Sequence, residues 1–154
     1  MQTITLRLEK IISLDFSLYA LYNICMLTLE YCEDEKLKGA LAGELFPGEG
    51  VGCAVALLSD GVPCGLAEYA LEEGGVRLKK VGIVKGERGK GYGDFFTRAL
   101  VFKFMQSGMD ILVDGRSAYF ENLGFKADGK GGMRVSPDEV VFPSQCKHHR
   151  EENK

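Results

Sequence analysis

The sequence reads Glu87-Arg88-Gly89-Lys90-Gly91-Tyr92-Gly93 at the point where a predicted strand is followed by a predicted helix. The apolar residues 81–84 precede this stretch, and a helical pattern begins at Asp94. Glycines let the backbone approach a ligand closely, and a helix start places N–H groups without intrahelical acceptors beside the positive end of the helix dipole. The stretch therefore predicts a binding site for a pyrophosphate.

The pattern of apolar residues predicts strands and helices on both sides of this stretch. Before it we expect a strand at 3–9 and two helices, whose apolar faces are Leu18, Leu21, Cys25, Leu29 and Cys32, and then Leu37, Ala40, Leu41 and Leu45. An antiparallel meander of three strands follows, at 51–58, 63–72 and 76–84. After the stretch we expect a helix at 90–107, a strand at 110–113, a helix at 118–123 between Ser117 and Gly124, and strands at 125–127 and 133–135.

This order, β-α-α-β-β-β-α-β-α-β-β, predicts an α+β fold with helices against a mostly antiparallel sheet. The 154 residues are expected to form one domain, 1–145, followed by a charged tail, 146–154. A net charge of −3 lacks the basic excess of nucleic-acid-binding proteins, and no apolar run is long enough to span a membrane. Five widely spaced cysteines favour reduced thiols and a cytoplasmic protein.

Other phosphate-binding loops fit the glycine stretch less well. A dinucleotide fingerprint needs the spacing G-x-G-x-x-G between parallel strands, whereas a meander precedes this loop. A Walker loop needs Ser or Thr after Gly-Lys, and here Gly91 follows Lys90. The remaining alternative is a strand-to-helix turn that needs its glycines for geometry alone.

Two motifs together resemble the GNAT N-acetyltransferases. Arg88-x-x-Gly91-x-Gly93 after a strand is similar to the acyl-CoA pyrophosphate loop of that family. Tyr119-Phe120-Glu121-Asn122-Leu123-Gly124-Phe125 resembles its second motif, a short helix that ends on Leu-Gly-Phe. One helix and one strand separate the motifs, as in the family, and the predicted element order matches over nearly the whole chain. The resemblance implies the GNAT fold and an acyl-CoA-dependent N-acetyltransferase.

The resemblance also implies how acetyl-CoA or CoA would lie. The strand that enters the loop would part from the strand at 111–113 and leave a V-shaped gap for the thioester. Ile83 and Val84 would line the strand edge along the pantetheine arm, and Asn122 would flank its far side. The pyrophosphate would be bound by the backbone of the loop residues, namely Arg88, Gly89, Lys90, Gly91, Tyr92 and Gly93. Lys85 and Lys90 could add positive charge near the phosphates.

Acetyl transfer would proceed by direct attack of an amine on the thioester, with no covalent enzyme intermediate. Glu68, a carboxylate in the middle of an apolar strand, is the candidate base. Its alternatives are a position on an exposed strand face or an ion pair across the hairpin to Arg77 or Lys79. Many family members carry a tyrosine general acid at the position of Phe120. Tyr119 is the neighbouring candidate, although it lies about 100° away around a helix and is expected to point elsewhere.

The implied partner is an amine acceptor, either a small molecule or a peptide, and dimers are common in the family. The alternative from another class is a non-catalytic module that binds CoA or acetyl-CoA on the same scaffold; a structural subunit with a vestigial loop is a third. Cys146, His148 and His149 lie close together in the tail but offer no fourth ligand, so no metal site is predicted.

Overall fold

A computed structural model describes residues 3–5 and 26–142 of the chain. Within them, eight strands form one mixed sheet in the order β1-β2-β3-β4-β5-β6-β8-β7, in which only β5 and β6 are parallel. The strands are β1 (Thr3–Thr5), β2 (Leu27–Tyr31), β3 (Cys53–Ser59), β4 (Val62–Glu72), β5 (Gly75–Ile83), β6 (Asp110–Asp114), β7 (Lys126–Ala127) and β8 (Gly132–Val135).

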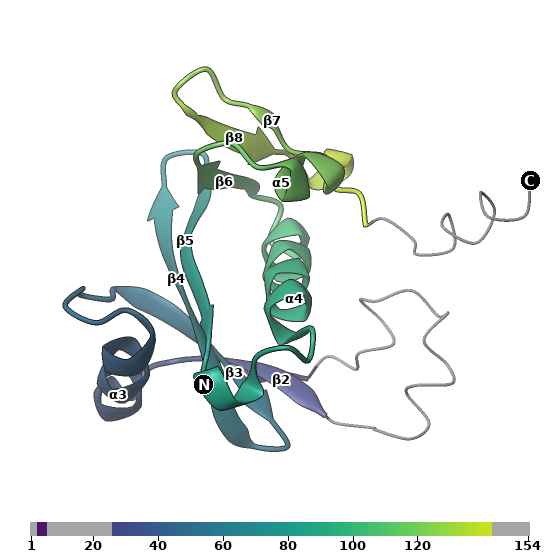
Figure 1. The fold of residues 1–154 in the computed structure, drawn as a ribbon. Helices are drawn as coiled ribbons and strands as arrows, with labels where there is room; N and C mark the ends of the chain where they lie inside the picture. The colour runs from purple at the N-terminus through teal and green to yellow at the C-terminus, as the bar shows by residue number, and fades with distance from the viewer. Residues whose placement is uncertain (1–2, 6–25, 143–154) are drawn as a thin grey trace, which may run out of the picture.

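Helices cover both faces of this sheet (Figure 1). They are α3 (Glu35–Leu45), α4 (Tyr92–Gln106) and α5 (Ala118–Asn122), with 3-10 turns η2 (Lys85–Glu87) and η3 (Pro137–Glu139). We call the two sides of the sheet the α3 face and the α4 face, and α5 lies on the α4 face. None of the helices in the described residues combines the length and apolar character that a membrane crossing needs.

Each face of the sheet buries its own apolar cluster. On the α4 face, α4 packs its side chains at a spacing of three or four residues against the sheet, through Phe96, Leu100, Val101 and Phe104. On the α3 face the cluster is smaller, and Leu41 and Ala42 of α3 cover small residues of β3 and β4 such as Ala54, Ala56 and Leu66. The sheet therefore has a large core on the side of the glycine loop and a shallow one on the other.

The contact between β5 and β6 covers only part of β5. The two strands pair from Gly75 and Asp110 to Leu78 and Val113, and beyond these residues they part. Residues 79–83 of β5 therefore have a neighbouring strand on the β4 side only, among the strands described. This parting agrees with the V-shaped gap that the resemblance implies.

A β-bulge lies in β5 at the point where the strands part. Tyr69 of β4 pairs with Leu78, but the next residue, Glu68, pairs with Lys80, so Lys79 is an extra residue. Because the bulge breaks the alternation of the strand, Leu78 and Val81 both lie on the α4 face although they are three residues apart.

Most predicted elements are confirmed, but the end of the first predicted helix is wrong. Leu29 and Cys32 were expected on its apolar face, and Leu29 instead lies in β2. Leu27 and Leu29 are buried and alternate with half-buried residues, and pairing with β3 satisfies their backbone groups. Residues 15–25 of this prediction, and residues 6–9 of the first predicted strand, lie outside the described residues.

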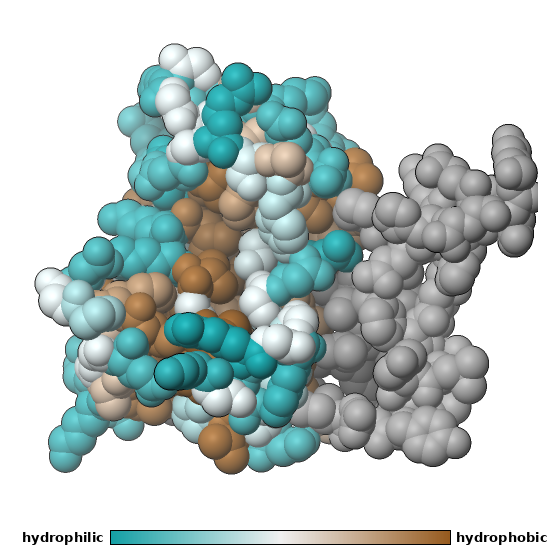
Figure 2. Space-filling model, viewed as in Figure 1, coloured by the Kyte–Doolittle hydropathy of each residue, from teal (hydrophilic) through white to brown (hydrophobic). Residues whose placement is uncertain are grey.

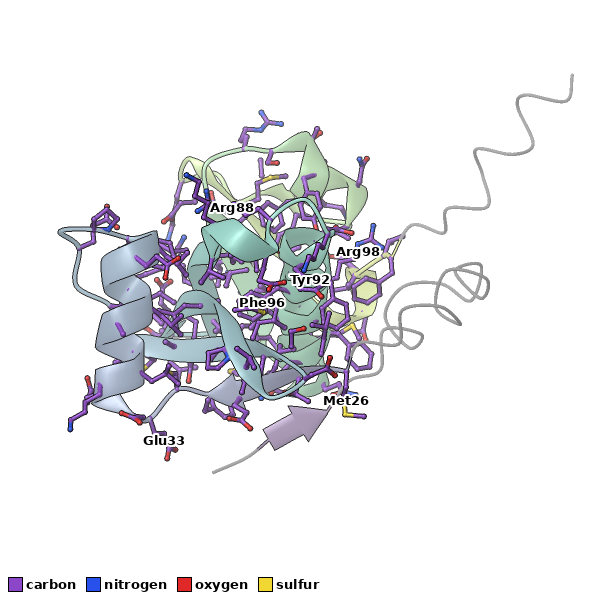
Figure 3. The ribbon with its side chains drawn as sticks, turned by 60° about the horizontal axis from the view of Figure 1, so that its bottom comes forward. Met26, Glu33, Arg88, Tyr92, Phe96 and Arg98 are labelled. Atoms are coloured by element: carbon purple, nitrogen blue, oxygen red, sulfur yellow. The ribbon has the colours of Figure 1, made fainter. Side chains whose placement is uncertain are left out.

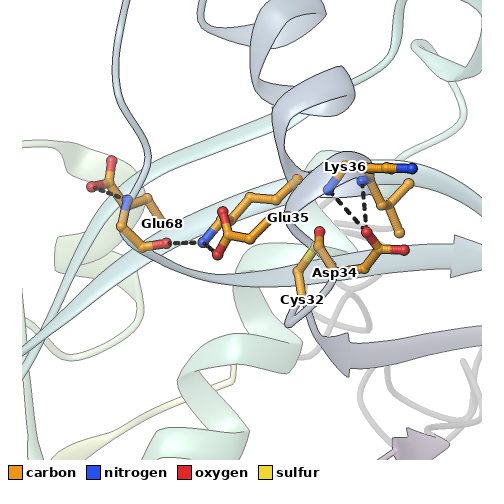
Figure 4. Close-up of polar contacts among 8 residues, drawn as sticks. Cys32, Asp34, Glu35, Lys36 and Glu68 are labelled. Atoms are coloured by element: carbon orange, nitrogen blue, oxygen red, sulfur yellow. Dashed lines mark hydrogen bonds and ion pairs between the residues drawn. The ribbon is translucent and has the colours of Figure 1, made fainter.

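Asp34 caps the N-terminus of α3. Its carboxylate accepts hydrogen bonds from the backbone N–H groups of Lys36 and Leu37, at 2.9 and 3.3 Å (Figure 4). We expect Asp34→Ala to lower the free energy of unfolding by about 1 kcal/mol, because it leaves these donors without their acceptor. Asp34→Asn keeps an acceptor and should lose much less. Urea denaturation of the three proteins measures this, and equal losses for Ala and Asn would show that the hydrogen-bond acceptor is not the source of the stabilisation.

Candidate functional site

A pocket of about 360 Å³ lies on the α4 face, where β5 and β6 part. Figure 2 shows apolar side chains along this hollow, with hydrophilic side chains around it. Strands β5 and β6, helix α4 and the start of α5 form its walls. The lining residues are Leu78, Lys79 and Val81 of β5, Val113 and Asp114 of β6, Thr97 of α4, and Ser117, Tyr119 and Phe120 at the start of α5. The pocket is thus a mainly apolar space that carries a few polar groups, as ligand pockets do.

The glycine loop lies at the N-terminus of α4, about 9 Å along the helix axis from Thr97 in the pocket wall. Gly89 and Gly91 adopt φ of +83° and +79°, which other residues rarely adopt. An added Cβ at either glycine would meet no atom within 4 Å, so the space above the loop is open. The first amides of α4 have no intrahelical acceptors, so loop and helix start together can bind an anion.

The charged side chains of the loop are held by other groups of the protein. The guanidinium Nε of Arg88 donates to the carbonyl of Ile83 at 2.8 Å, which fastens the loop to the end of β5. Lys90 pairs with Glu87 at 2.7 Å. Figure 3 looks at this end of the molecule and shows Arg88, Tyr92 and Arg98 along it. The ring hydroxyl of Tyr92 contacts Ser59 at 3.5 Å, so the backbone of Tyr92 is the part that a ligand at the loop would meet.

Tyr119 lies in the pocket wall beside Phe120, contrary to the expectation that it would point elsewhere. The helix α5 has only five residues and its start borders the pocket, so successive side chains flank the same opening. The hydroxyl of Tyr119 donates to Asp94 at 2.5 Å, and Asp94 also accepts from Arg98 at 3.0 Å. Burial, and then the neighbouring Asp94 carboxylate, raise the pKa of Tyr119 above its usual value, so the phenol keeps its proton.

Asp94 would otherwise be unfavourable beside a bound phosphate, because it lies in the first turn of α4. Its carboxylate instead binds Tyr119 and Arg98, and the ion pair with Arg98 offsets its charge. The same contacts join the start of α4 to α5. The loop and the pocket wall therefore form one connected structure.

Glu68 lies on the α3 face, opposite the pocket, and only 8% of its surface is exposed. Its Oε1 accepts from the backbone N–H of Gly52 at 3.2 Å. The carbonyl of Gly52 accepts from Lys38 of α3, so a chain of contacts runs from Glu68 to the helix (Figure 4). Its Oε2 lies 3.4 Å from Lys80, an ion pair that lacks hydrogen-bond geometry. Glu68 is thus fixed in place with one oxygen that accepts no hydrogen bond from the described residues.

The prediction that Glu68 pairs with Arg77 or Lys79 is wrong, and the bulge is the reason. The extra residue Lys79 shifts the register so that Lys80 stands opposite Glu68. Lys80 also pairs with Glu49 at 2.6 Å, and this contact, more than Glu68, raises the pKa of Lys80. Arg77 pairs with Glu72 and Asp114 instead.

Several predicted site residues lie near the pocket without lining it. Ile83 is buried and Val84 lies just past the end of β5, so both are nearer the loop than the pocket. Asn122 is exposed at the end of α5. The sequence prediction missed Lys79 and Asp114, which do line the pocket. Asp114 could have been predicted as a site residue, because it directly follows the predicted strand 110–113. Lys79 could not, because its position in the pocket wall depends on the bulge.

The described part of the chain holds no cluster of metal ligands. In residues 3–5 and 26–142, no three His, Cys, Asp or Glu side chains gather as a metal-binding group. Cys146, His148 and His149 lie outside the described residues.

Comparisons with known proteins support the fold. No family model matches the sequence, and no curated protein matches it. Among solved structures, the ribosomal-protein-S18-alanine N-acetyltransferase from Escherichia coli superposes with a TM-score of 0.56 at 13% identity, over 78% of this chain and 98% of that chain. A GNAT family N-acetyltransferase from Escherichia coli in complex with CoA gives 0.56 at 12% identity, over 73% and 81%. The chain therefore has the GNAT fold.

Proposed function

We propose that this chain binds acetyl-CoA and transfers its acetyl group to an amine by direct attack. The observation that carries the proposal is the position of the pocket, which opens at the parting of β5 and β6 and shares α4 with the glycine loop. A single extended ligand could therefore place a pyrophosphate at the loop and a thioester in the pocket.

The residues present fit such a ligand. Space above Gly89 and Gly91 is open, which a pyrophosphate against their amides would need. The unpaired edge of β5 offers backbone groups to the amides of the pantetheine arm, and Leu78, Val81 and Val113 offer apolar contact. Acetyl-CoA would supply the activated thioester carbonyl. The chain itself would bind and orient this group and keep water from its apolar side.

The acceptor amine would approach from the α3 face, through the gap between the parted strands. The carboxylate of Glu68 is on that face, so a proton from the amine would pass to it through water. The amine nitrogen forms a bond to the acyl carbon, the carbon–sulfur bond breaks, and CoA leaves as a thiolate. Lys80 lies 3.4 Å from Oε2 of Glu68, on the same face of the sheet.

The leaving thiolate would depart without a proton from Phe120, which has no hydroxyl. Tyr119 lines the pocket, but its hydroxyl donates its proton to Asp94. A thiolate is a good leaving group because the pKa of the corresponding thiol is about 8.5 in water. This step therefore makes the smallest demand on the enzyme.

The second candidate function is a module that binds CoA without catalysis. Two contacts favour it: Asp94 holds the phenol proton of Tyr119, and the Glu68 carboxylate lies behind the sheet against Gly52. Neither group is therefore directed at the space in which the thioester would lie. Both functions share the loop and the pocket, so an experiment must separate binding from transfer.

Thermal unfolding with acetyl-CoA and with CoA tests binding, and release of free thiol in the presence of amines tests transfer. We expect both ligands to raise the melting temperature, because a ligand that binds only the folded state stabilises it. Thiol release with at least one amine of a panel of small amines and lysine peptides would support the transferase. A shift without release would support the binding module, and no shift with either ligand would refute both.

Glu68→Gln provides a test of the proposed base. It should reduce the rate of thiol release by on the order of a hundredfold, because glutamine cannot accept the proton. It keeps an oxygen for the N–H of Gly52, so the CoA-induced thermal shift should remain. Glu72→Gln, in the same strand but exposed and paired with Arg77, is the matched control and should keep the rate. An unchanged rate in Glu68→Gln would exclude Glu68 as the base.

A further inference from the structure

Lys79 lines the pocket and carries a primary amine. It is the extra residue of the β5 bulge, and it lies directly after Leu78, the last residue of β5 that pairs with β6. The residue therefore stands at the vertex where the two strands part. In the proposed function this vertex is where the thioester carbonyl would lie.

The ammonium group of Lys79 forms no ion pair and no side-chain hydrogen bond with the described residues, and the residue is exposed. The neighbouring Lys80 differs in each respect, because it lies on the α3 face and pairs with Glu49 and Glu68. Lys79 thus lies on the side of the pocket and has no ion pair with the described residues. Lys80 lies on the opposite side of the sheet and is paired.

We propose that Lys79 is itself an acyl acceptor, so that the protein acetylates this lysine from acetyl-CoA bound in its own pocket. The inference rests on the proposed function, because it needs the thioester in the pocket. It assigns a modification site and an acceptor class, a primary alkyl amine, to the same pocket.

The reaction balances without another reactant. The ammonium of Lys79 first loses a proton to water, which reaches it because the residue is exposed. The amine nitrogen then forms a bond to the acyl carbon and gives up a second proton to water, the carbon–sulfur bond breaks, and CoA leaves as a thiolate. The products are an N-acetylated lysine and free CoA. When the protein holds the amine and the thioester together, no bimolecular encounter is needed. This proximity can accelerate such reactions by many orders of magnitude.

The charged groups around Lys79 permit this reaction. Asp114 lines the opposite wall, but its Oδ1 accepts from Arg77 at 2.7 Å, so its charge is offset. The charge of Lys79 also lowers the pKa of Glu72, but the main cause is the hydrogen bond from Arg77, which binds the Glu72 carboxylate. The phenol of Tyr119 is uncharged and donates to Asp94. These three carboxylates, of Asp114, Glu72 and Asp94, are therefore each paired with an arginine and not with Lys79.

The experiment is incubation of the full chain with acetyl-CoA and no other amine, followed by mass spectrometry of the intact protein and of its peptides. We expect one acetyl group, located at Lys79 and absent from Lys80. The rate at Lys79 should exceed the rate at other exposed lysines by on the order of a hundredfold or more. Lys79→Arg keeps the positive charge and should abolish this fast modification.

Gly91→Glu separates catalysed from spontaneous acetylation, because it should prevent CoA binding at the loop while Lys79 remains exposed. Fast acetylation of Lys79 that persists in Gly91→Glu, or acetylation spread evenly over exposed lysines, would overturn the proposal. So would a wild-type protein that shows the CoA-induced thermal shift but no acetyl group at Lys79. The absence of the thermal shift itself would refute the proposed function, which distinguishes the two failures.

Discussion

Gly91→Glu is expected to abolish the thermal shift produced by acetyl-CoA and CoA. Gly91 is the N-cap of α4, and its added Cβ would project into open space above the loop. A glutamate there places bulk and negative charge where a pyrophosphate would meet the helix amides. At a ligand concentration of about 100 times Kd, the wild-type protein would gain about 2.7 kcal/mol of stability, and the variant would gain none.

Gly91→Ala is the matched control, because the positive φ of Gly91 strains any residue with a Cβ. Alanine carries this backbone strain without the charge and most of the bulk. We expect a lower melting temperature in both variants without ligand, and a ligand-induced shift in Gly91→Ala only. A shift in Gly91→Glu as large as in Gly91→Ala would refute the assignment of the loop as a phosphate site.

Gly124→Ala is expected to destabilise the fold far more than a methyl group added at an unobstructed glycine. A Cβ at Gly124 would collide with the backbone carbonyl oxygen of Glu139, and the φ of Gly124 is +97°. Backbone would have to move, because the clashing atom is a carbonyl, and the left-handed φ adds its own strain. We expect a loss of about 3 kcal/mol, a large part of the stability of a domain of this size, measured by denaturant unfolding.

Gly129→Ala isolates the backbone term of that loss. Gly129 has a φ of +79° in the turn between β7 and β8, but an added Cβ would meet nothing within 4 Å. We expect it to cost about 1 kcal/mol. If the two variants lost the same stability, the contact with Glu139 would not limit residue 124, and the requirement for glycine would be conformational alone.

The parts of the fold that could be predicted well from the sequence are those specified by local chemistry. The meander from β3 to β5 follows from glycine turns and apolar strands, and α4 follows from its helical spacing and the glycines before it. The strand β2 was mistaken for helix because Cys25, Leu29 and Cys32 also fit a helical stripe. Only its pairing with β3, which is distant in sequence, decides between the two patterns.

The same distinction applies to the candidate site. The loop could be predicted because its glycines lie within five residues of one another, and a turn of this kind needs no partner distant in sequence. The bulge at Lys79 could not, because it exists only in the register of β4 against β5. Because of that register, Glu68 stands opposite Lys80 instead of Lys79, and Lys79 lines the pocket.

The unpaired edge of β5 also bears on how this protein avoids aggregation. Unpaired strand edges at the outside of a sheet attract strands of other proteins. The free edge of residues 79–83 lies inside the sheet, between β4 and the pocket walls formed by β6, α4 and α5. A strand of another protein could pair with this edge only by entering between β5 and β6, whereas it reaches an outer edge directly from solvent. We therefore expect this edge to promote aggregation less than an outer edge of the same length.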